Sequence, residues 1–351
     1  MTRLTEILLS QIERSGPITI AEYMTQCLLH PEFGYYTTQR PIGAGGDFIT
    51  APEISQMFGE MLGLCLAQNW IDQGQPSRFT LAELGPGRGV LMADILRATK
   101  AVAGFHQAAE IILVEASPEL QTVQAQMLGD YDVTWVNTVT ALPEQPLFLV
   151  ANEFFDCLPI RQYSRTEHGW QEHMIGAENG ALGFILAAQT PTSMFADAPL
   201  GTILELCPSA IAIISDIARI ISAQGGTALV IDYGDENPVG DSFQAVKHHA
   251  KVDPLQNCGA SDLTAHVNFK SLSDAAATFA QASKITTQGA FLERLGITPR
   301  AQSLAAGLDG GALENHITAH RRLTHPDEMG HLFKVLAISP KEAPPPIGFD
   351  I

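Results

Sequence analysis

The stretch Phe79-Thr-Leu-Ala-Glu83-Leu-Gly85-Pro-Gly87-Arg-Gly89 decides the fold of this chain. A short apolar run ends at an acidic residue, and three glycines follow at alternate positions. Val90-Leu-Met-Ala-Asp-Ile-Leu96 then begins an apolar pattern with helical spacing. This order predicts a strand, a tight glycine turn and a helix, the first unit of a nucleotide-binding α/β sheet. The glycines permit positive φ and a close approach of the backbone to a ligand.

The spacing of these glycines separates two kinds of cofactor. A dinucleotide fingerprint reads G-x-G-x-x-G and places a pyrophosphate at the helix N-terminus. This turn reads G-x-G-x-G, and Glu83 would repel a pyrophosphate but suits a cationic amino group. S-adenosylmethionine (SAM) has an ammonium, a sulfonium and no phosphate. The pattern resembles the first motif of class I SAM-dependent methyltransferases, so we predict that SAM is bound by Glu83, Gly85, Pro86, Gly87 and Gly89.

A second acidic residue supports the same ligand. Ile111-Ile-Leu-Val-Glu115 is a buried type of strand that ends in Glu115. An acidic residue at the end of the second strand is where such folds bind ribose hydroxyls. Each glutamate alone is also compatible with a solvated strand end, and the glycines alone with a purely structural turn. Their combination on successive strands favours SAM.

Charge and composition disfavour several classes of function. The chain has 351 residues and a net charge of −18, which disfavours nucleic acid and favours a basic substrate or the basic segment of a partner protein. Solubility is an alternative reason for the acidity. The five cysteines form no C-x-x-C pair and no metal-binding motif is present, so we predict no metal.

The sequence carries no targeting or membrane signal. No apolar run reaches the length of a membrane span, so we expect no membrane insertion. The first 14 residues read as an amphipathic helix with both charge signs, unlike a secretory signal or a mitochondrial presequence. We therefore expect a cytoplasmic protein of bacterial type, or the mature form of a processed protein.

Strands that alternate with helices from Phe79 onward predict a parallel, doubly wound sheet. The strands are expected at Thr80–Glu83, Ile111–Glu115, Val133–Val136, Leu147–Asn152, Ala228–Asp232 and Phe333–Ser339. We expect a helical cap with a glycine-rich loop at 1–75 and a methyltransferase-like α/β domain at 76–339. Insertions fall at about 160–187, a β-meander, and at about 235–300, with loop and helical character. A proline-rich surface coil is expected at 340–351.

Candidate catalytic residues follow the strand ends, where ligands bind in open α/β sheets. Asn152, Glu153 and Asp156 follow the fourth strand, and Asp47 and Glu53 could reach over from the cap. If the methyl acceptor is an arginine, carboxylates here would hold its guanidinium and orient one nitrogen toward the methyl donor. The alternatives are structural: Asn152 and Glu153 as a strand-end cap, and Asp47 as the support of a turn. Asp232 reads as an ordinary strand terminus, and Phe154 and Phe155 read as core or as pocket walls.

Several motifs that span nearly the whole chain resemble the MidA-like SAM-dependent methyltransferases. The matching stretches are Pro31–Tyr36, Gly46–Gln56, Phe58–Glu60, Glu83–Gly89, Asn152–Asp156 with Leu158-Pro159, Ile231–Gly234, Asp262–Phe269, Gln288–Leu292 and Met329–Val335. The resemblance implies SAM as cofactor, with Gly46–Glu60 lining the site and Glu53 of that segment among the cofactor-binding residues. It also implies symmetric dimethylation of an arginine in a partner protein. In the mitochondrial members, which are located in the matrix, this partner is a subunit of complex I. Asn268 departs from the family pattern, which has aspartate there.

Other classes of function stay open from the sequence. One is an assembly chaperone that binds SAM and acts mainly by holding a partner subunit. Another is a small-molecule methyltransferase. The sequence Asn152-Glu-Phe-Phe155 only faintly echoes the motif of DNA amino-methyltransferases, whose two prolines are absent. A homodimer is also compatible with the sequence.

Overall fold

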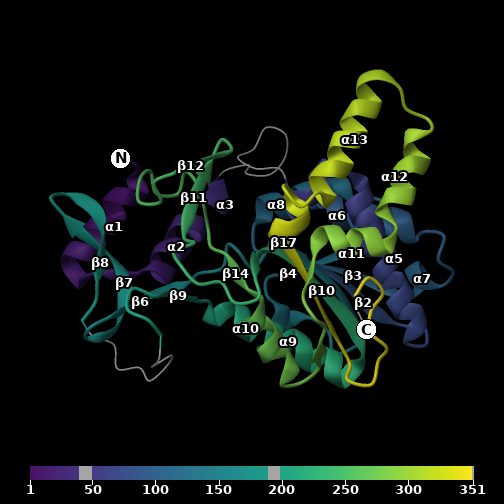
Figure 1. Cartoon of the computed structure of the whole chain (residues 1–351), viewed down its shortest axis with the longest axis horizontal. Helices are drawn as coiled ribbons and strands as arrows, with labels where there is room; N and C mark the ends of the chain where they lie inside the picture. The colour runs from purple at the N-terminus through teal and green to yellow at the C-terminus, as the bar shows by residue number, and fades with distance from the viewer. Residues whose placement is uncertain (39–49, 189–197, 350–351) are drawn as a thin grey trace. The chain divides into compact units, whose positions relative to one another are not determined.

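The computed structural model describes residues 1–38, 50–188 and 198–349. The chain folds as two compact units (Figure 1). Unit 1 is drawn from the ranges 1–48, 156–210 and 237–266, and unit 2 from the ranges 49–155, 211–236 and 267–351. Among the described residues, none of the helices combines the length and the apolarity that crossing a membrane requires.

Unit 2 is built around a sheet that contains nine strands among the described residues, in the order β15-β17-β10-β5-β2-β3-β4. β14 also pairs with β10, and β16 with β17. The strands are β2 Phe79–Leu84, β3 Ala109–Val114, β4 Val133–Val136, β5 Leu147–Asn152, β10 Gly226–Asp235, β14 Val267–Asn268, β15 Gln281–Ala282, β16 Thr286–Thr287 and β17 Phe333–Ser339. All six strands expected from the sequence are confirmed.

The sheet is mixed, which corrects the expectation of a parallel sheet. β4, β3, β2, β5 and β10 run parallel, but β17 is antiparallel to β10. The antiparallel strand has no sequence signature of its own, because the buried run Phe333–Ser339 is as apolar as the parallel strands beside it. The expected loop-and-helix insertion at 235–300 also contains short strands, among them β14 to β16.

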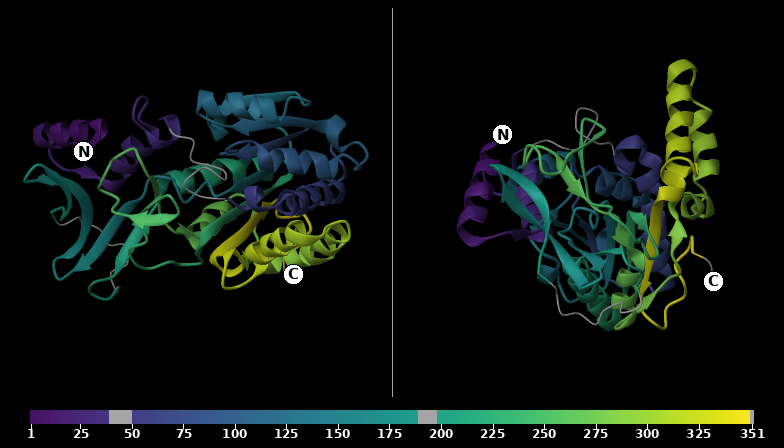
Figure 2. Two further views of the ribbon diagram at one scale, coloured as in Figure 1. Left: turned by 90° about the horizontal axis from the view of Figure 1, so that it is seen from above. Right: turned by 60° about the vertical axis from the view of Figure 1, so that its left-hand side comes forward.

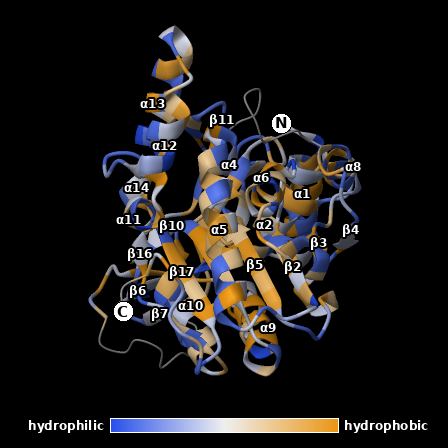
Figure 3. Cartoon of the chain, turned by 90° about the vertical axis from the view of Figure 1, so that its right-hand side faces the viewer, coloured by the Kyte–Doolittle hydropathy of each residue, from blue (hydrophilic) through white to orange (hydrophobic). Residues whose placement is uncertain are grey.

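Helices bury both faces of this sheet. On one face α5 (Gln56–Asp72) and α6 (Val90–Thr99) pack on side chains such as Leu81 and Val150. Figure 3 shows strands rich in hydrophobic residues beside α5. The other helices of unit 2 are α4 Ala51–Ile54, α7 Phe105–Ala108, α8 Pro118–Met127, α9 Pro208–Gln224 (which begins in unit 1), α10 Phe269–Ala277, α11 Gln288–Leu295, α12 Ile297–Ala305, α13 Gly310–Thr324 and α14 Met329–Leu332, with a 3-10 turn at Val139–Ala141.

Two glycines set the contact between α5 and α6. A Cβ on Gly59 would lie 2.5 Å from Cβ of Asp94, and one on Gly63 would lie 3.0 Å from Cα of Ile95. Such distances are shorter than ordinary van der Waals contact, so neither position has room for a side chain. The spacing of four residues places both glycines on the same face of α5. The two helices therefore touch through their backbones.

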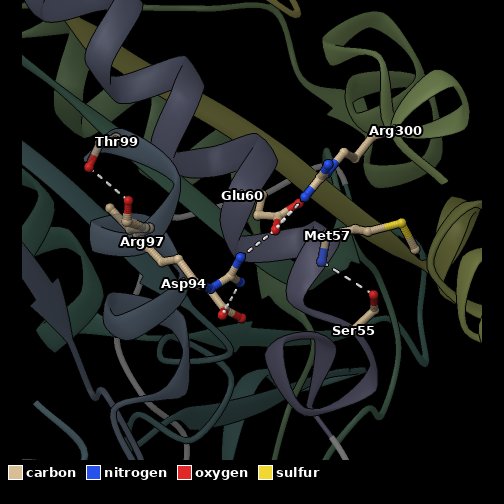
Figure 4. Close-up of polar contacts among 8 residues, drawn as sticks. Ser55, Met57, Glu60, Asp94, Arg97, Thr99 and Arg300 are labelled. Atoms are coloured by element: carbon tan, nitrogen blue, oxygen red, sulfur yellow. Dashed lines mark hydrogen bonds and ion pairs between the residues drawn. The ribbon is translucent and has the colours of Figure 1, made fainter. Parts of the chain in front are cut away.

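An ion cluster beside these glycines joins three helices of unit 2 (Figure 4). The buried Glu60 on α5 accepts hydrogen bonds from Arg97 Nη1 of α6 at 2.6 Å and from Arg300 Nε of α12 at 2.7 Å. Arg97 also binds Asp94 at 2.6 Å. Burial by itself raises the pKa of Glu60, but the hydrogen bonds and charges of the two arginines outweigh it and lower that pKa.

The C-terminal part of unit 2 departs from the sequence expectation. α12 and α13 lie side by side as an antiparallel pair (Figures 1 and 2). In the tail that was expected to be surface coil, Phe349 is buried and its ring lies 5.1 Å from that of Phe291. A single aromatic residue in a proline-rich segment has no periodicity, so the sequence pattern could not place it in the core.

Unit 1 combines the N-terminal helices with a meander. Its elements are α1 Arg3–Ser15, β1 Ile18–Thr19, α2 Ile20–Leu29, α3 Tyr35–Thr38, β6 Arg161–Thr166, β7 Gly169–Glu178, β8 Ala181–Leu186, β9 Ile203–Leu206, β11 Gln244–Lys247, β12 Ala250–Val252 and β13 Asp262–Thr264. β6, β7 and β8 form the expected antiparallel meander, and Asn179 and Gly180 make its turn with φ of 52° and 75°. Thr19, the N-cap of α2, forms a capping box with Glu22.

Candidate functional site

The glycine turn lies where the sequence places it, between β2 and α6 of unit 2. Gly85, Gly87 and Gly89 all have positive φ, at 58°, 52° and 83°. The N–H of Gly89 donates to the Pro86 carbonyl at 2.7 Å, which closes the turn. A Cβ on Gly85 would lie 2.9 Å from Cδ2 of Phe154, so this aromatic ring lies directly against the turn. The backbone of the turn therefore has the conformation that its glycines predict.

Glu83 is buried at the end of β2. Its carboxylate accepts the backbone N–H of Met92 in the first turn of α6, whereas Oε2 is buried and has no hydrogen-bond partner among the described residues. Burial, assisted by the nearby charge of Glu115, raises the pKa of Glu83 to about 8, although the Met92 bond opposes the shift. An unpaired buried carboxylate oxygen is costly, so this position is suited to a cationic ligand.

Glu115 directly follows β3 and is held by local donors. The N–H of Ser117 donates to Oε1 at 2.7 Å, and Gln124 Nε2 donates to Oε2 at 3.2 Å. Burial raises the pKa of Glu115, and these hydrogen bonds oppose the shift. The carboxylate is therefore fixed beside the glycine turn, as expected for a ribose ligand.

Gln124 on α8 is a site residue that the sequence analysis missed. It is fully buried and its Nε2 also donates to the Gly87 carbonyl at 2.8 Å. Trp135 of β4 donates to its Oε1 at 2.8 Å, which fixes the orientation of the amide. A glutamine in an otherwise ordinary helix gives no motif, so only the fold brings Gln124 to the turn.

Asn152 and Glu153 lie at the end of β5. Oε1 of Glu153 accepts Nδ2 of Asn152 at 3.0 Å and the N–H of Ala51 at 3.1 Å. Asn152 is buried, and its Oδ1 has no partner among the described residues. Two neighbouring strands therefore each end in a buried acceptor, Glu83 Oε2 and Asn152 Oδ1.

The remaining candidates are Glu53, Asp156 and Asp47. Glu53 on α4 faces Arg88 of the glycine turn, with Nη1 to Oε2 at 3.4 Å, so the structure pairs it with the turn. Asp156 lies in unit 1, where it is buried and its carbonyl accepts the N–H of Ala265 at 2.9 Å. Asp47 lies outside the described residues.

Asp232 and Phe155 have structural roles in the fold. Asp232 is fully buried, and its carboxylate accepts the N–H groups of Phe155 and Tyr233, both at 2.9 Å. It therefore ties the ends of β5 and β10 together. Phe155 is buried as a core residue. Among the described residues, no group of histidine, cysteine and acidic side chains has the arrangement of a metal site.

These features fit SAM. The two unpartnered buried acceptors can receive the N–H donors of an ammonium group, Glu115 can accept ribose hydroxyls, and the glycines leave room for the ligand. A mixed sheet with an antiparallel last strand and an acidic residue before G-x-G-x-G defines the class of SAM-dependent methyltransferases with a Rossmann-like fold.

Comparison with known proteins leads to the same class and to a family. Residues 61–289 match the sequence model of the family described as "Putative S-adenosyl-L-methionine-dependent methyltransferase". The chain is 36% identical to "Protein arginine methyltransferase NDUFAF7, mitochondrial" of Danio rerio, over 94% of this chain and 85% of the relative. Its human counterpart is 32% identical, over 97% of this chain and 84% of the relative.

A solved structure agrees with the fold and the cofactor. A Burkholderia thailandensis protein bound to S-adenosyl-homocysteine superposes with a TM-score of 0.85 at 28% identity, over 98% of this chain and 93% of that chain. The chain belongs to this family of SAM-dependent methyltransferases, which the MidA-like resemblance indicated. It is a methyltransferase with the class I fold, and SAM is its cofactor.

Proposed function

We propose that this methyltransferase acts on an arginine of a partner protein. The observation that carries the proposal is the similarity, along 94% of the chain, to a relative named as a protein arginine methyltransferase. The net charge of −18 supports it, because an acidic enzyme attracts a basic segment of a partner. The family resemblance adds symmetric dimethylation as the product and a respiratory complex I subunit as a candidate acceptor. A cytoplasmic location is part of the same proposal.

The cofactor side of the site follows from the residues of unit 2. Glu83 and Asn152 accept hydrogen bonds from the ammonium, Glu115 accepts the ribose hydroxyls, and the turn from Gly85 through Pro86 and Gly87 to Gly89 gives the ligand its room. Bound SAM supplies an electrophilic methyl group to a nucleophile held in line with it. Glu53 contributes by holding the turn through Arg88.

The acceptor side of the site must bind the arginine and orient it toward the methyl group. A guanidinium is protonated in water, so its nitrogen is a poor nucleophile unless carboxylates bind and orient it. Asp156 and Asp47 are the carboxylates proposed for this task.

The experiment uses a proteome as the source of acceptors. An extract of cells that lack the gene is incubated with the purified protein and methyl-tritiated SAM, and the labelled proteins are hydrolysed for amino-acid analysis. Label in symmetric dimethylarginine is expected, and a Gly87→Val control gives none. Label confined to small molecules would refute the protein acceptor, and label in another amino acid would refute arginine.

A further inference from the structure

Glu153 has an unfavourable backbone conformation. It is a non-glycine residue with φ of 52°, directly after β5, and its N–H donates to the Ile231 carbonyl of β10 at 2.9 Å. A left-handed conformation is uncommon for a residue with a long side chain and costs free energy. Interactions of the Glu153 side chain must therefore offset the free-energy cost of this backbone conformation.

The side chain joins two elements through a single oxygen. Oε1 of Glu153 accepts both the N–H of Ala51 and Nδ2 of Asn152. Ala51 is the first residue of α4, where a helix has N–H groups without an internal partner, and the N-cap Thr50 makes no side-chain bond there. α4 also carries Glu53, which reaches Arg88 of the glycine turn. Glu153 thus anchors the helix that contacts the turn.

The same oxygen determines which atom Asn152 presents. An ionised carboxylate only accepts hydrogen bonds, so the amide of Asn152 must turn its Nδ2 toward Glu153. Its Oδ1 is then left buried and without a partner among the described residues. With this orientation, the end of β5 offers an acceptor to an ammonium group. The opposite orientation would offer a donor and repel that group.

We propose that Glu153 is a positioning residue for SAM, acting through the amide of Asn152 and through α4. This role replaces the expectation that Glu153 itself holds the acceptor guanidinium. It rests on the cofactor site of the proposed function and does not depend on the identity of the acceptor. In this backbone conformation one carboxylate oxygen reaches both donors.

Equilibrium titration of SAM by calorimetry tests the role. In Glu153→Gln the amide oxygen can accept both hydrogen bonds, so SAM should bind within about threefold of the wild-type affinity. Glu153→Gly removes the acceptor but tolerates the positive φ. It should bind SAM at least about tenfold more weakly, the effect of losing hydrogen bonds to a charged group, while its melting temperature is maintained.

A double-mutant cycle with Asn152→Ala separates positioning from a general loss of structure. If Glu153 acts through Asn152, the losses of SAM affinity in Asn152→Ala and in Glu153→Gly are coupled. The double variant then binds SAM more tightly than the product of the two fold-losses predicts. Wild-type SAM affinity in Glu153→Gly would overturn the proposal. So would a Glu153→Gln variant that keeps SAM affinity but loses turnover as completely as Glu153→Gly, because a charge that acts on the acceptor gives that pattern. Failure to find a methylated arginine affects the proposed function and leaves these affinities valid.

Discussion

The buried carboxyl of Glu83 makes the stability of the free protein depend on pH. The pKa of Glu83 is about 8 in the folded chain, against an ordinary value of 4.5. The folded state therefore keeps a proton that the unfolded state has lost between these two pH values. The contribution of Glu83 to stability is therefore largest below pH 4.5 and is lost as the pH rises to about 8, because the unfolded state releases this proton while burial holds it in the folded state. Glu83→Gln keeps the shape but cannot ionise.

The size of the effect follows from the shift in pKa. One unit of pKa corresponds to about 1.4 kcal/mol, so the full shift of Glu83 amounts to roughly 5 kcal/mol. Between pH 5 and pH 9 about 4 kcal/mol of this appears, since a small part is already lost at pH 5. The difference in unfolding free energy between Glu83→Gln and the wild type should therefore move by about 4 kcal/mol in favour of the variant. Costs of the amide that do not depend on pH cancel in this comparison.

Urea unfolding followed by tryptophan fluorescence measures this difference. In a Trp170→Phe background the two remaining tryptophans, Trp70 and Trp135, both report on unit 2. The same substitution of Glu83 should weaken SAM binding roughly 10- to 100-fold, because a charged hydrogen-bond partner of the ammonium is lost. A stability difference that stays constant from pH 5 to pH 9 would show that Glu83 titrates normally, and the reasoning from its burial would be wrong.

Three further predictions concern the supports of the site. Glu60→Ala leaves the partly exposed Arg97 and Arg300 without their shared carboxylate and should destabilise unit 2 by about 1 to 2 kcal/mol in the same urea assay; a loss below about 0.5 kcal/mol would show that the cluster contributes no more than a surface ion pair. Gly87→Val forces a β-branched residue to a φ of 52° and should abolish measurable SAM binding in calorimetry while far-UV circular dichroism is retained; normal affinity would contradict the assigned turn. Gln124→Met keeps the volume but removes the donor to the Gly87 carbonyl, and it should weaken SAM binding about tenfold without changing turnover at saturating SAM.

The sequence predicts the central sheet well because its strands are buried on both faces. Runs such as Leu147–Asn152 consist almost entirely of apolar residues, and their alternation with helices leaves few topologies. The direction of β17 could not be predicted in the same way, since an antiparallel strand buried on both faces has the same composition. The short strands in 235–300 could not be predicted, because pieces of two to four residues have no measurable period.

The residues of the candidate site also differ in whether the sequence predicts them. Glycines and acids that must occupy fixed places relative to a strand end, such as Gly87 and Glu83, are visible as a motif. Residues that reach the same place from another element are not, and Gln124 and Ala51 are examples. Glu153 was found as a candidate, but the sequence could not predict its strained φ or its bond to a backbone N–H.

The backbone contact between α5 and α6 also bears on how sequences in this family can drift. Gly59 and Gly63 face α6, and every other amino acid adds a Cβ that presses on Asp94 or on the main chain at Ile95. In a saturation mutagenesis library, these two positions should tolerate as little change as the glycines of the turn. A map of mutational tolerance would therefore mark a second set of glycines outside the turn, whose depletion reflects the spacing of two helices.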